Sequence, residues 1–325
     1  MTETHDNSGI GGSDAAAILD LYRNEPERLD PFKTALDVYE RVTTVRRGDK
    51  WDPPPISFRA YMGQMAEPKI FKDFCDTNEF KRSEFRRNVK IMVDAEPHYR
   101  GEIDALSSKR DMLVDCKLVG RFAETNFGEE DSDEMPATML CQLAYYRLFK
   151  PVSRCLLACW LDHKPKGQHY KQYEYTPDDE LEETLRYVTE KFWTDHIFKE
   201  IPPTVQQVSD SKTIARIFPK QTLDLREATA AEVELVECIQ RMKRDSKKLD
   251  EGLKVAEGEL KRLIGLHEGL KLPGGATVTW KANKTGEKTD WKLVAEKAGA
   301  SAELIAECTQ PQPGARPLRV PQLKD

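Results

Sequence analysis

Two acidic residues and a lysine lie on neighbouring segments that read as β-strands. Asp104 lies in GEIDAL, residues 101–106, and Asp115 and Lys117 lie in VDCKLVG, residues 114–120. Successive side chains of a strand point to opposite faces, so Asp115 and Lys117 share one face. Charged groups on a half-buried strand are costly unless they are paired or used. The two are therefore either an ion pair on an edge strand or part of a site.

Carboxylates beside a lysine are suited to hydrolysing a phosphodiester. Magnesium prefers oxygen ligands, usually a few carboxylates with waters and substrate completing the shell. Divalent ions neutralise the phosphate and activate a water, and a lysine can orient or deprotonate that water and balance charge in the transition state. Asp104 and Asp115 are separated by the length of a hairpin, which would bring them side by side.

Glu67 offers a third carboxylate. It lies in a helix expected over residues 57–76, in register with Ile70, Phe71 and Phe74, so it falls on the apolar stripe of that helix. A carboxylate in that position needs a partner or a cation. We therefore expect Glu67 to join the two aspartates and the lysine around one pocket, with a snorkelling or ion-paired helix residue as the alternative.

The elements around these residues mix helices and strands. Strand-like runs cover residues 88–94, 100–106 and 111–119, and the short SSKR link predicts a hairpin between the last two. Two more strands are expected at 154–161 and 169–175, with helices before, between and after the strands. This alternation predicts an α/β core with a central mixed sheet flanked by helices.

The composition limits the class of protein. The 325 residues carry a formal net charge of −6, no run of 18 apolar residues occurs, and the first residues are polar, so we expect a soluble, cytoplasmic protein without a membrane span. Seven scattered cysteines indicate reduced thiols, and only Cys155 and Cys159 are close in sequence, which argues against a metal cluster. An acidic chain can still have a locally basic channel for nucleic acid.

The last third of the chain has a different pattern. Apolar residues recur at steps of four and three from Leu235 to Leu263, which predicts a long, coiled-coil-like helix over about residues 227–268. Strand-like ATVTWKA and a tail with RPLRV follow. We expect one domain at 1–205 and a C-terminal accessory region at 206–325, the latter used for packing or self-association.

The order of several motifs resembles one nuclease family. Asp, a hairpin and then Asp-x-Lys resembles the PD-(D/E)xK signature, which is loose by itself. Around it the chain has GIGGSDAAAIL, GQMAEP, GEIDAL, VDCK, MP with MLCQLAYY, and KFW before IPP. This series, over roughly residues 8–205, resembles the YqaJ-like viral recombinase or phage lambda exonuclease family, and it implies a restriction-endonuclease-like core.

The resemblance implies a role for each matching residue. Glu67, Asp104, Asp115 and the backbone carbonyl of Cys116 would bind Mg²⁺, with two ions per site and Mn²⁺ as a substitute. Lys117 would position and activate the attacking water. Gln142 would lie beside the metals and orient the water or the scissile phosphate. Ser13, at a glycine-rich helix start, would contact a terminal 5′-phosphate, as helix N-termini favour anions.

Some positions depart from the family pattern or allow another interpretation. The arginine that usually precedes GIGGSD is absent, the acidic residue before the lysine is Asp115 rather than glutamate, and Phe127 takes the place of a tryptophan. Ser13 or Asp14 could simply cap the helix, and Gln142 could be a core amide.

The implied activity is that of a magnesium-dependent exonuclease acting on linear double-stranded DNA. It would digest from the 5′ end and leave 3′ single-stranded tails for phage-type recombination, as a homotrimeric ring that works with a single-strand annealing protein. One alternative is a RecB-like endonuclease or single-strand nuclease on the same core. Another is a DNA-end-binding assembly module with a degenerate site.

Overall fold

The chain forms two compact units, Met1–Phe218 and Pro219–Asp325, in a computed structural model. The structure describes residues 7–53, 55, 57–92, 98–281, 291–301, 304 and 307. The predicted domain boundary lies at residue 205, and the helix that follows it is part of the first unit. In the described residues, no helix is both long and apolar enough to cross a membrane.

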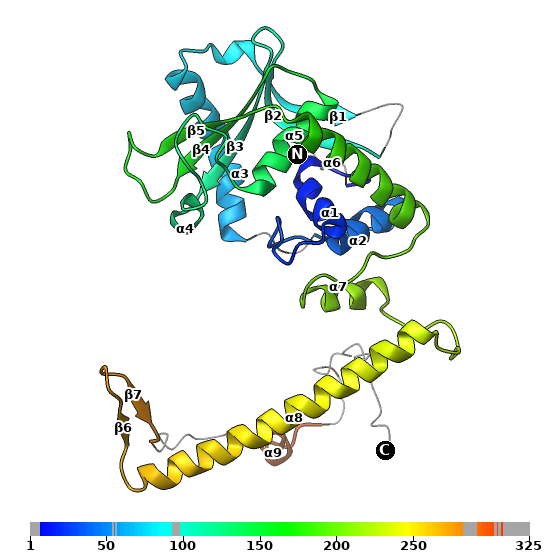
Figure 1. Cartoon of the computed structure of the whole chain (residues 1–325), viewed down its shortest axis with the longest axis vertical. Helices are drawn as coiled ribbons and strands as arrows, with labels where there is room; N and C mark the ends of the chain where they lie inside the picture. The colour runs from blue at the N-terminus through cyan, green and yellow to red at the C-terminus, as the bar shows by residue number, and fades with distance from the viewer. Residues whose placement is uncertain are drawn as a thin grey trace. The chain divides into compact units, whose positions relative to one another are not determined.

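A five-stranded mixed sheet lies at the centre of the first unit (Figure 1). The strands follow the order of the sequence across the sheet, and all neighbours are antiparallel except β3 and β4, which are parallel. This confirms the predicted mixed sheet. The end of the predicted first strand, residues 93 and 94, lies outside the described residues. The strands are β1 (Arg86–Met92), β2 (Arg100–Ser107), β3 (Met112–Val119), β4 (Arg154–Leu161) and β5 (Tyr170–Tyr175).

Helices cover both faces of this sheet and bury two separate apolar clusters. Helix α3 packs on one face through Ile70, Phe71 and Phe74, while the other face is covered mainly by α1, α2, α5 and α6. The central parallel strands β3 and β4 are buried on both sides and read as mostly apolar runs, whereas β1 and β5 carry many polar residues. The helices are α1 (Ala15–Tyr22), α2 (Ala35–Arg46), α3 (Phe58–Thr77), α4 (Arg121–Glu124), α5 (Ala137–Phe149), α6 (Asp179–Phe192) and α7 (Asp210–Ile217), with 3₁₀ turns η1 (Gly12–Asp14) and η2 (Arg82–Glu84) and a π-helical segment η3 (Trp193–Phe198) after α6.

Short α7 is tied to α2 by buried polar contacts. Asp210 accepts hydrogen bonds from the Thr34 hydroxyl at 3.0 Å and from the Gln206 amide at 2.7 Å. Thr34 also caps α2 by accepting from the Asp37 amide. The segment after residue 205 is thus held to the N-terminal helices by hydrogen bonds that apolar periodicity does not reveal.

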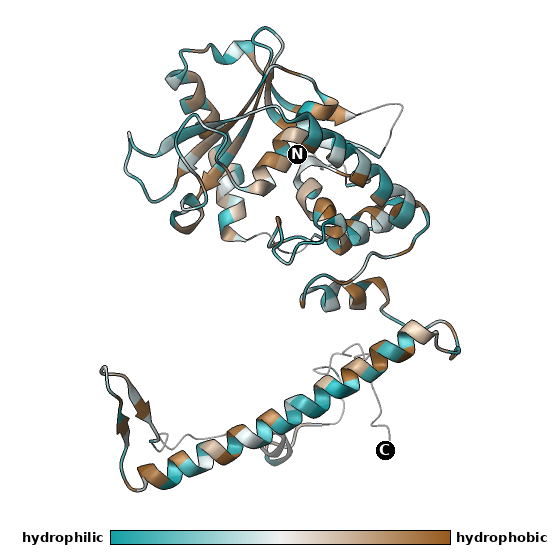
Figure 2. Cartoon of the chain, viewed as in Figure 1, coloured by the Kyte–Doolittle hydropathy of each residue, from teal (hydrophilic) through white to brown (hydrophobic). Residues whose placement is uncertain are grey.

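The second unit contains the long helix that the apolar repeat predicts. Helix α8 spans Ala230–Ile264 and is followed by β6 (Gly269–Lys271), β7 (Thr277–Thr279) and α9 (Trp291–Lys297). Thr229 and Glu232 form the capping box that begins α8. Apolar residues recur among polar ones along α8 (Figure 2). Most of these apolar residues are exposed within this single chain. A coiled-coil pairing of α8 stays a prediction, and the RPLRV tail lies outside the described residues.

Candidate active site

The hairpin of β2 and β3 is regularly paired only near its turn. Ala105, Leu106 and Ser107 pair with Val114, Leu113 and Met112. Beyond these pairs β3 continues beside β4 as far as Val119. We call the paired part the closed end of the hairpin and the part that begins at Asp104 and Asp115 the open end. The predicted acidic residues therefore lie where the two strands part.

A local irregularity in β1 and β2 sets the direction of Asp104. Ile103 and Ala105 would face the same way in a regular strand, but they contact the two different apolar clusters on opposite faces of the sheet. The register places Asn88 opposite Asp104, and Asn88 has a φ of +52°, a conformation that asparagine tolerates better than most residues. The strands thus change face at Asp104, and its carboxylate reaches across to β3.

Asp104 makes a direct contact with β3. Its Oδ2 accepts a hydrogen bond from the Cys116 amide at 2.7 Å. Burial raises the pKa of Asp104 to about 8, and the negative charge of Asp115 adds to the increase while the Lys117 ammonium opposes it. Crowded, buried carboxylates of this kind are common at functional sites because a cation can bind between them.

Asp115 and Lys117 form a close pair, as their shared strand face predicts. Lys117 Nζ lies 2.5 Å from Asp115 Oδ2, and the carboxylate is almost completely buried. Burial by itself would lower the pKa of Lys117, but the charges of Asp115 and Asp104 outweigh it, so the net shift of this pKa is upward. Lys117 is therefore a charged hydrogen-bond donor in this state, rather than a proton acceptor.

Gln142 contacts the same carboxylate from α5. Its Nε2 donates to Asp115 Oδ1 at 3.2 Å and to the Tyr146 hydroxyl at 2.9 Å. The ring of Tyr146 also contacts the glycine-rich start of the chain, where a Cβ on Gly12 would lie 2.7 Å from Tyr146 Cε1. Gln142 is therefore both buried and beside the acidic residues, and Tyr146 is a neighbour that the sequence pattern did not single out.

Glu67 lines the open end from α3, and it is ion-paired there, which is the alternative given for it in the sequence. Its Oε1 forms an ion pair with Nη2 of Arg87 on β1, and about a quarter of each side chain is exposed. Arg87 Nε also donates to the backbone carbonyl of Asp104 at 2.6 Å. Arg87 was not found by sequence reasoning, because it precedes the signature residues and matches no motif.

Some of these residues line one cavity with a volume of about 420 Å³. Glu67, Asp104 and Lys117 contribute to its wall, and the buried Asp115 lies behind Lys117. The first turns of α3 contribute the larger part of the remaining lining. The full lining is Ser57, Arg59, Ala60, Gly63, Gln64, Glu67, Asp104, Cys116, Lys117 and Leu118.

The side chains in this cavity offer oxygen donors, which is the type of ligand that a hard divalent cation prefers. In the part of the chain that the structure describes, no three His, Cys, Asp or Glu side chains are arranged to hold one ion. Arg87 and Lys117 instead neutralise Glu67 and Asp115. The donor set nevertheless fits, because it consists of carboxylate oxygens, and a cation would relieve the repulsion from Asp115 and Glu67 that acts on Asp104.

Ser13 lies in the glycine-rich segment and is exposed. Lys33 Nζ lies 3.3 Å from its hydroxyl and 3.0 Å from its carbonyl, and it also pairs with Asp14 at 2.9 Å. The arginine expected before GIGGSD is absent, but Lys33 supplies a cation beside Ser13 from a distant part of the sequence.

Capping of the helix start was the other interpretation. Asp14 occupies the N-cap position of α1, although its side chain makes no hydrogen bond to that helix. Asp14 turns back to accept from the Gly11 amide at 2.8 Å and is buried between Lys33 and Arg41. Burial would raise the pKa of Asp14, but the two cations outweigh it and lower this pKa overall. Asp14 therefore caps the 3₁₀ turn η1, which leads directly into α1, rather than α1 itself.

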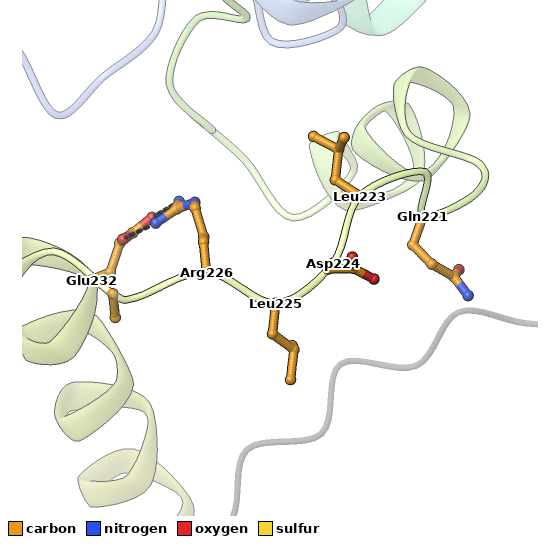
Figure 3. A pocket seen from close by; sticks show the side chains of 7 residues that line it. Gln221, Leu223, Asp224, Leu225, Arg226 and Glu232 are labelled. Carbon is orange, nitrogen blue, oxygen red and sulfur yellow. Dashed lines mark hydrogen bonds and ion pairs between the residues drawn. The ribbon is translucent and has the colours of Figure 1, made fainter.

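A second pocket lies in the segment that leads into α8 and has no comparable set of residues (Figure 3). Leu223 and Leu225 are almost fully exposed there, and the Arg226 guanidinium bonds Glu232, a residue of the α8 capping box. Arg226 and Glu232 are thus engaged with each other and with the helix start.

Comparisons with known proteins give structural likeness only. No protein-family model and no curated protein matches this chain. An alkaline exonuclease from Laribacter hongkongensis is 13% identical, with a TM-score of 0.45 over 65% of this chain and 95% of that one. A phage related exonuclease from Haemophilus somnus 129PT is also 13% identical, with a TM-score of 0.45 over 61% of this chain and 97% of that one.

Proposed function

We propose that this chain is a metal-dependent DNA exonuclease of the YqaJ-like viral recombinase type. It would digest linear double-stranded DNA from the 5′ end and leave 3′ single-stranded tails for phage-type recombination. The observation that carries this proposal is the meeting of Glu67, Asp104 and Lys117 in one cavity, with Asp115 paired to Lys117. The ordered motifs of the sequence support the same class of enzyme.

The residues divide the chemistry between them. Glu67, Asp104, Asp115 and the carbonyl of Cys116 would hold Mg²⁺, with Mn²⁺ as a substitute and two ions in the site, and the bound metal would neutralise the phosphate and lower the pKa of a water. Lys117 would donate to that water or to a phosphate oxygen and balance the developing negative charge. Gln142 would keep Asp115 in place from α5.

The exposed Ser13, with Lys33 beside it, would contact the 5′-phosphate of the DNA end. By the same family resemblance, the chain would assemble as a homotrimeric ring around DNA and work with a single-strand annealing protein in the cytoplasm of a bacterial or phage-infected cell. The C-terminal region with α8 would act as an accessory module for oligomer contacts, partner contacts or additional DNA binding.

A time course on end-labelled DNA in Mg²⁺ tests the proposal. The substrates are linear duplexes with 5′-phosphate or 5′-hydroxyl ends, single strands, and covalently closed circles. We expect mononucleotide release from linear duplex by wild type, fastest from phosphorylated ends, and none by Lys117→Ala. This variant should still bind DNA, because the other cavity residues are retained. EDTA should abolish release.

The remaining outcomes select the alternatives. Cleavage of closed circles would favour a RecB-like endonuclease, and preference for single strands a single-strand nuclease. A wild-type protein that binds DNA ends but stays inert in both Mg²⁺ and Mn²⁺ would favour the non-enzymatic end-binding module.

A further inference from the structure

Arg87 links three elements at the open end of the hairpin. It belongs to β1, its Nη2 pairs with Glu67 on α3, and its Nε donates to the carbonyl of Asp104 on β2 at 2.6 Å. Its guanidinium also lies over the ring of Phe71, 4.3 Å from the ring centroid. One planar cation therefore holds a helix carboxylate and the backbone of a strand carboxylate in a fixed relation.

In such an arrangement, a residue that does not itself bind the metal orients a side chain that does. Carboxylates that bind metals are usually hydrogen-bonded to a further group, and loss of that group typically weakens metal affinity about 10–100-fold. The contact recorded for Arg87 involves Oε1 of Glu67. The second carboxylate oxygen belongs to the same rigid plane, so fixing one oxygen also restricts where the other can lie.

We propose that Arg87 is a positioning residue that holds Glu67 in register with Asp104 for metal binding. The inference rests on the proposed function, since it assigns a role toward the metal at the same site. Arg87 acts through Glu67 and through the Asp104 backbone, and it contributes no ligand of its own. A lysine could keep the charge, but it could not reproduce the planar two-point contact or the stacking on Phe71.

The closed end of the same hairpin provides a matched control. Arg110 Nε donates to Glu84 Oε2 at 2.6 Å, and its guanidinium lies 3.8 Å from the centroid of the Phe80 ring. This unit has the same three residue types and a similarly exposed arginine, but its members do not line the 420 Å³ cavity. Arg110→Lys therefore removes equivalent contacts without touching the site.

Mn²⁺ binding to the full chain without DNA, measured by calorimetry, tests the proposal directly. We expect Arg87→Lys to raise the Mn²⁺ dissociation constant about 10–100-fold, and Arg110→Lys to leave it within about twofold. The Mg²⁺ concentration for half-maximal DNA hydrolysis should rise in parallel for Arg87→Lys, while the rate at saturating Mg²⁺ falls less. Thermal unfolding in EDTA establishes that both variants fold.

Each contrary result has a definite meaning. Unchanged Mn²⁺ affinity in Arg87→Lys overturns the positioning role, as does an equal loss in both lysine variants, which would indicate general destabilisation. If Arg87→Gln binds Mn²⁺ more tightly than wild type, the positioning role is also overturned, because Arg87 would then compete with the metal for Glu67. A wild type that binds no Mn²⁺ would instead refute the metal site of the proposed function, before any variant is compared.

Discussion

The two ends of the β2–β3 hairpin show how one pair of strands can serve stability at one end and chemistry at the other. At the closed end, Leu113 and Val114 are completely buried in the two apolar clusters. At the open end the same strands bury Asp115, half-bury Asp104 and pair Lys117 with Asp115. The point at which regular strand pairing stops separates the apolar closed end from the charged open end.

The charged residues at the open end lower the stability of the fold compared with the apolar residues at the closed end. A buried carboxylate is unfavourable unless it is paired or binds a cation. Asp115 has the Lys117 ammonium and a hydrogen bond from Gln142, whereas Asp104 has one backbone amide and repulsion from its neighbours. The two aspartates should therefore respond in opposite ways to neutralisation, which gives the comparison its sharpest tests.

The largest effect is expected from Asp115→Asn. The substitution leaves the Lys117 ammonium without its nearest counter-charge and removes one carboxylate from the site, so we expect DNA hydrolysis to fall about 1,000-fold. We also expect a loss of stability on the order of 1–3 kcal/mol, because one partner of a mostly buried ion pair is removed. Hydrolysis of labelled duplex and urea unfolding measure the two effects.

Leu113→Ala at the closed end is the control for that comparison. Leu113 is completely buried, so its truncation should cost about 2–4 kcal/mol in unfolding free energy. Activity of the folded variant should stay within about threefold of wild type, since the cavity is untouched. If Leu113→Ala lost as much activity as Asp115→Asn at equal stability, the two ends would not be functionally distinct.

A smaller effect is expected from Asp104→Asn in EDTA, and it should be a gain in unfolding free energy rather than a loss. The pKa of Asp104 is raised from 3.8 to about 8, so the folded chain binds more protons than the unfolded chain between these values. The Asp104 carboxyl therefore makes its full contribution to the unfolding free energy of wild type below about pH 4. This contribution is lost as the pH rises toward 8. Asparagine carries no such charge, so the variant should gain on the order of 1–3 kcal/mol at pH 8 and little at pH 5.

Urea unfolding at both pH values measures this difference. Glu84→Gln at the closed end is the matched control, because hydrogen bonds from Lys109 and Arg110 lower the pKa of Glu84, and its neutralisation should not stabilise the chain at either pH. Added Mg²⁺ should stabilise wild type at pH 8 but not Asp104→Asn. A pH-independent difference between wild type and Asp104→Asn would contradict the raised pKa.

Sequence patterns predicted the parts of this site that depend on local periodicity. The stripe that places Glu67 inward and the alternation that pairs Asp115 with Lys117 each follow from the geometry of one helix or one strand. The hairpin length brought Asp104 beside them. The mixed sheet followed from the order of the strands, although which neighbours are parallel was not specified.

The missing parts depend on contacts between distant segments. Arg87 lies 20 residues from Glu67, and Lys33 lies 20 residues from Ser13. The periodicity of a helix or strand therefore predicts neither contact. The left-handed Asn88 acts on Asp104 only through the register of β1 and β2. Along α8 the pattern predicted the helix itself, but an apolar seam does not specify which surface covers it.

The smallest predicted effect concerns Ser13, which extends the comparison from the acidic residues to the DNA end. Its hydroxyl is exposed beside Lys33, so it can donate to a terminal phosphate while the lysine provides charge. Ser13→Ala removes one donor and leaves the Lys33–Asp14 ion pair in place. We therefore expect the rate preference for 5′-phosphate over 5′-hydroxyl duplex to fall about threefold to tenfold, the size of one net hydrogen bond. Initial rates on the two substrates measure it, with Ser211→Ala, at an exposed serine of α7, as the control. Equal loss of rate on both substrates would mean that Ser13 supports the fold of the glycine-rich segment rather than recognition of the DNA end.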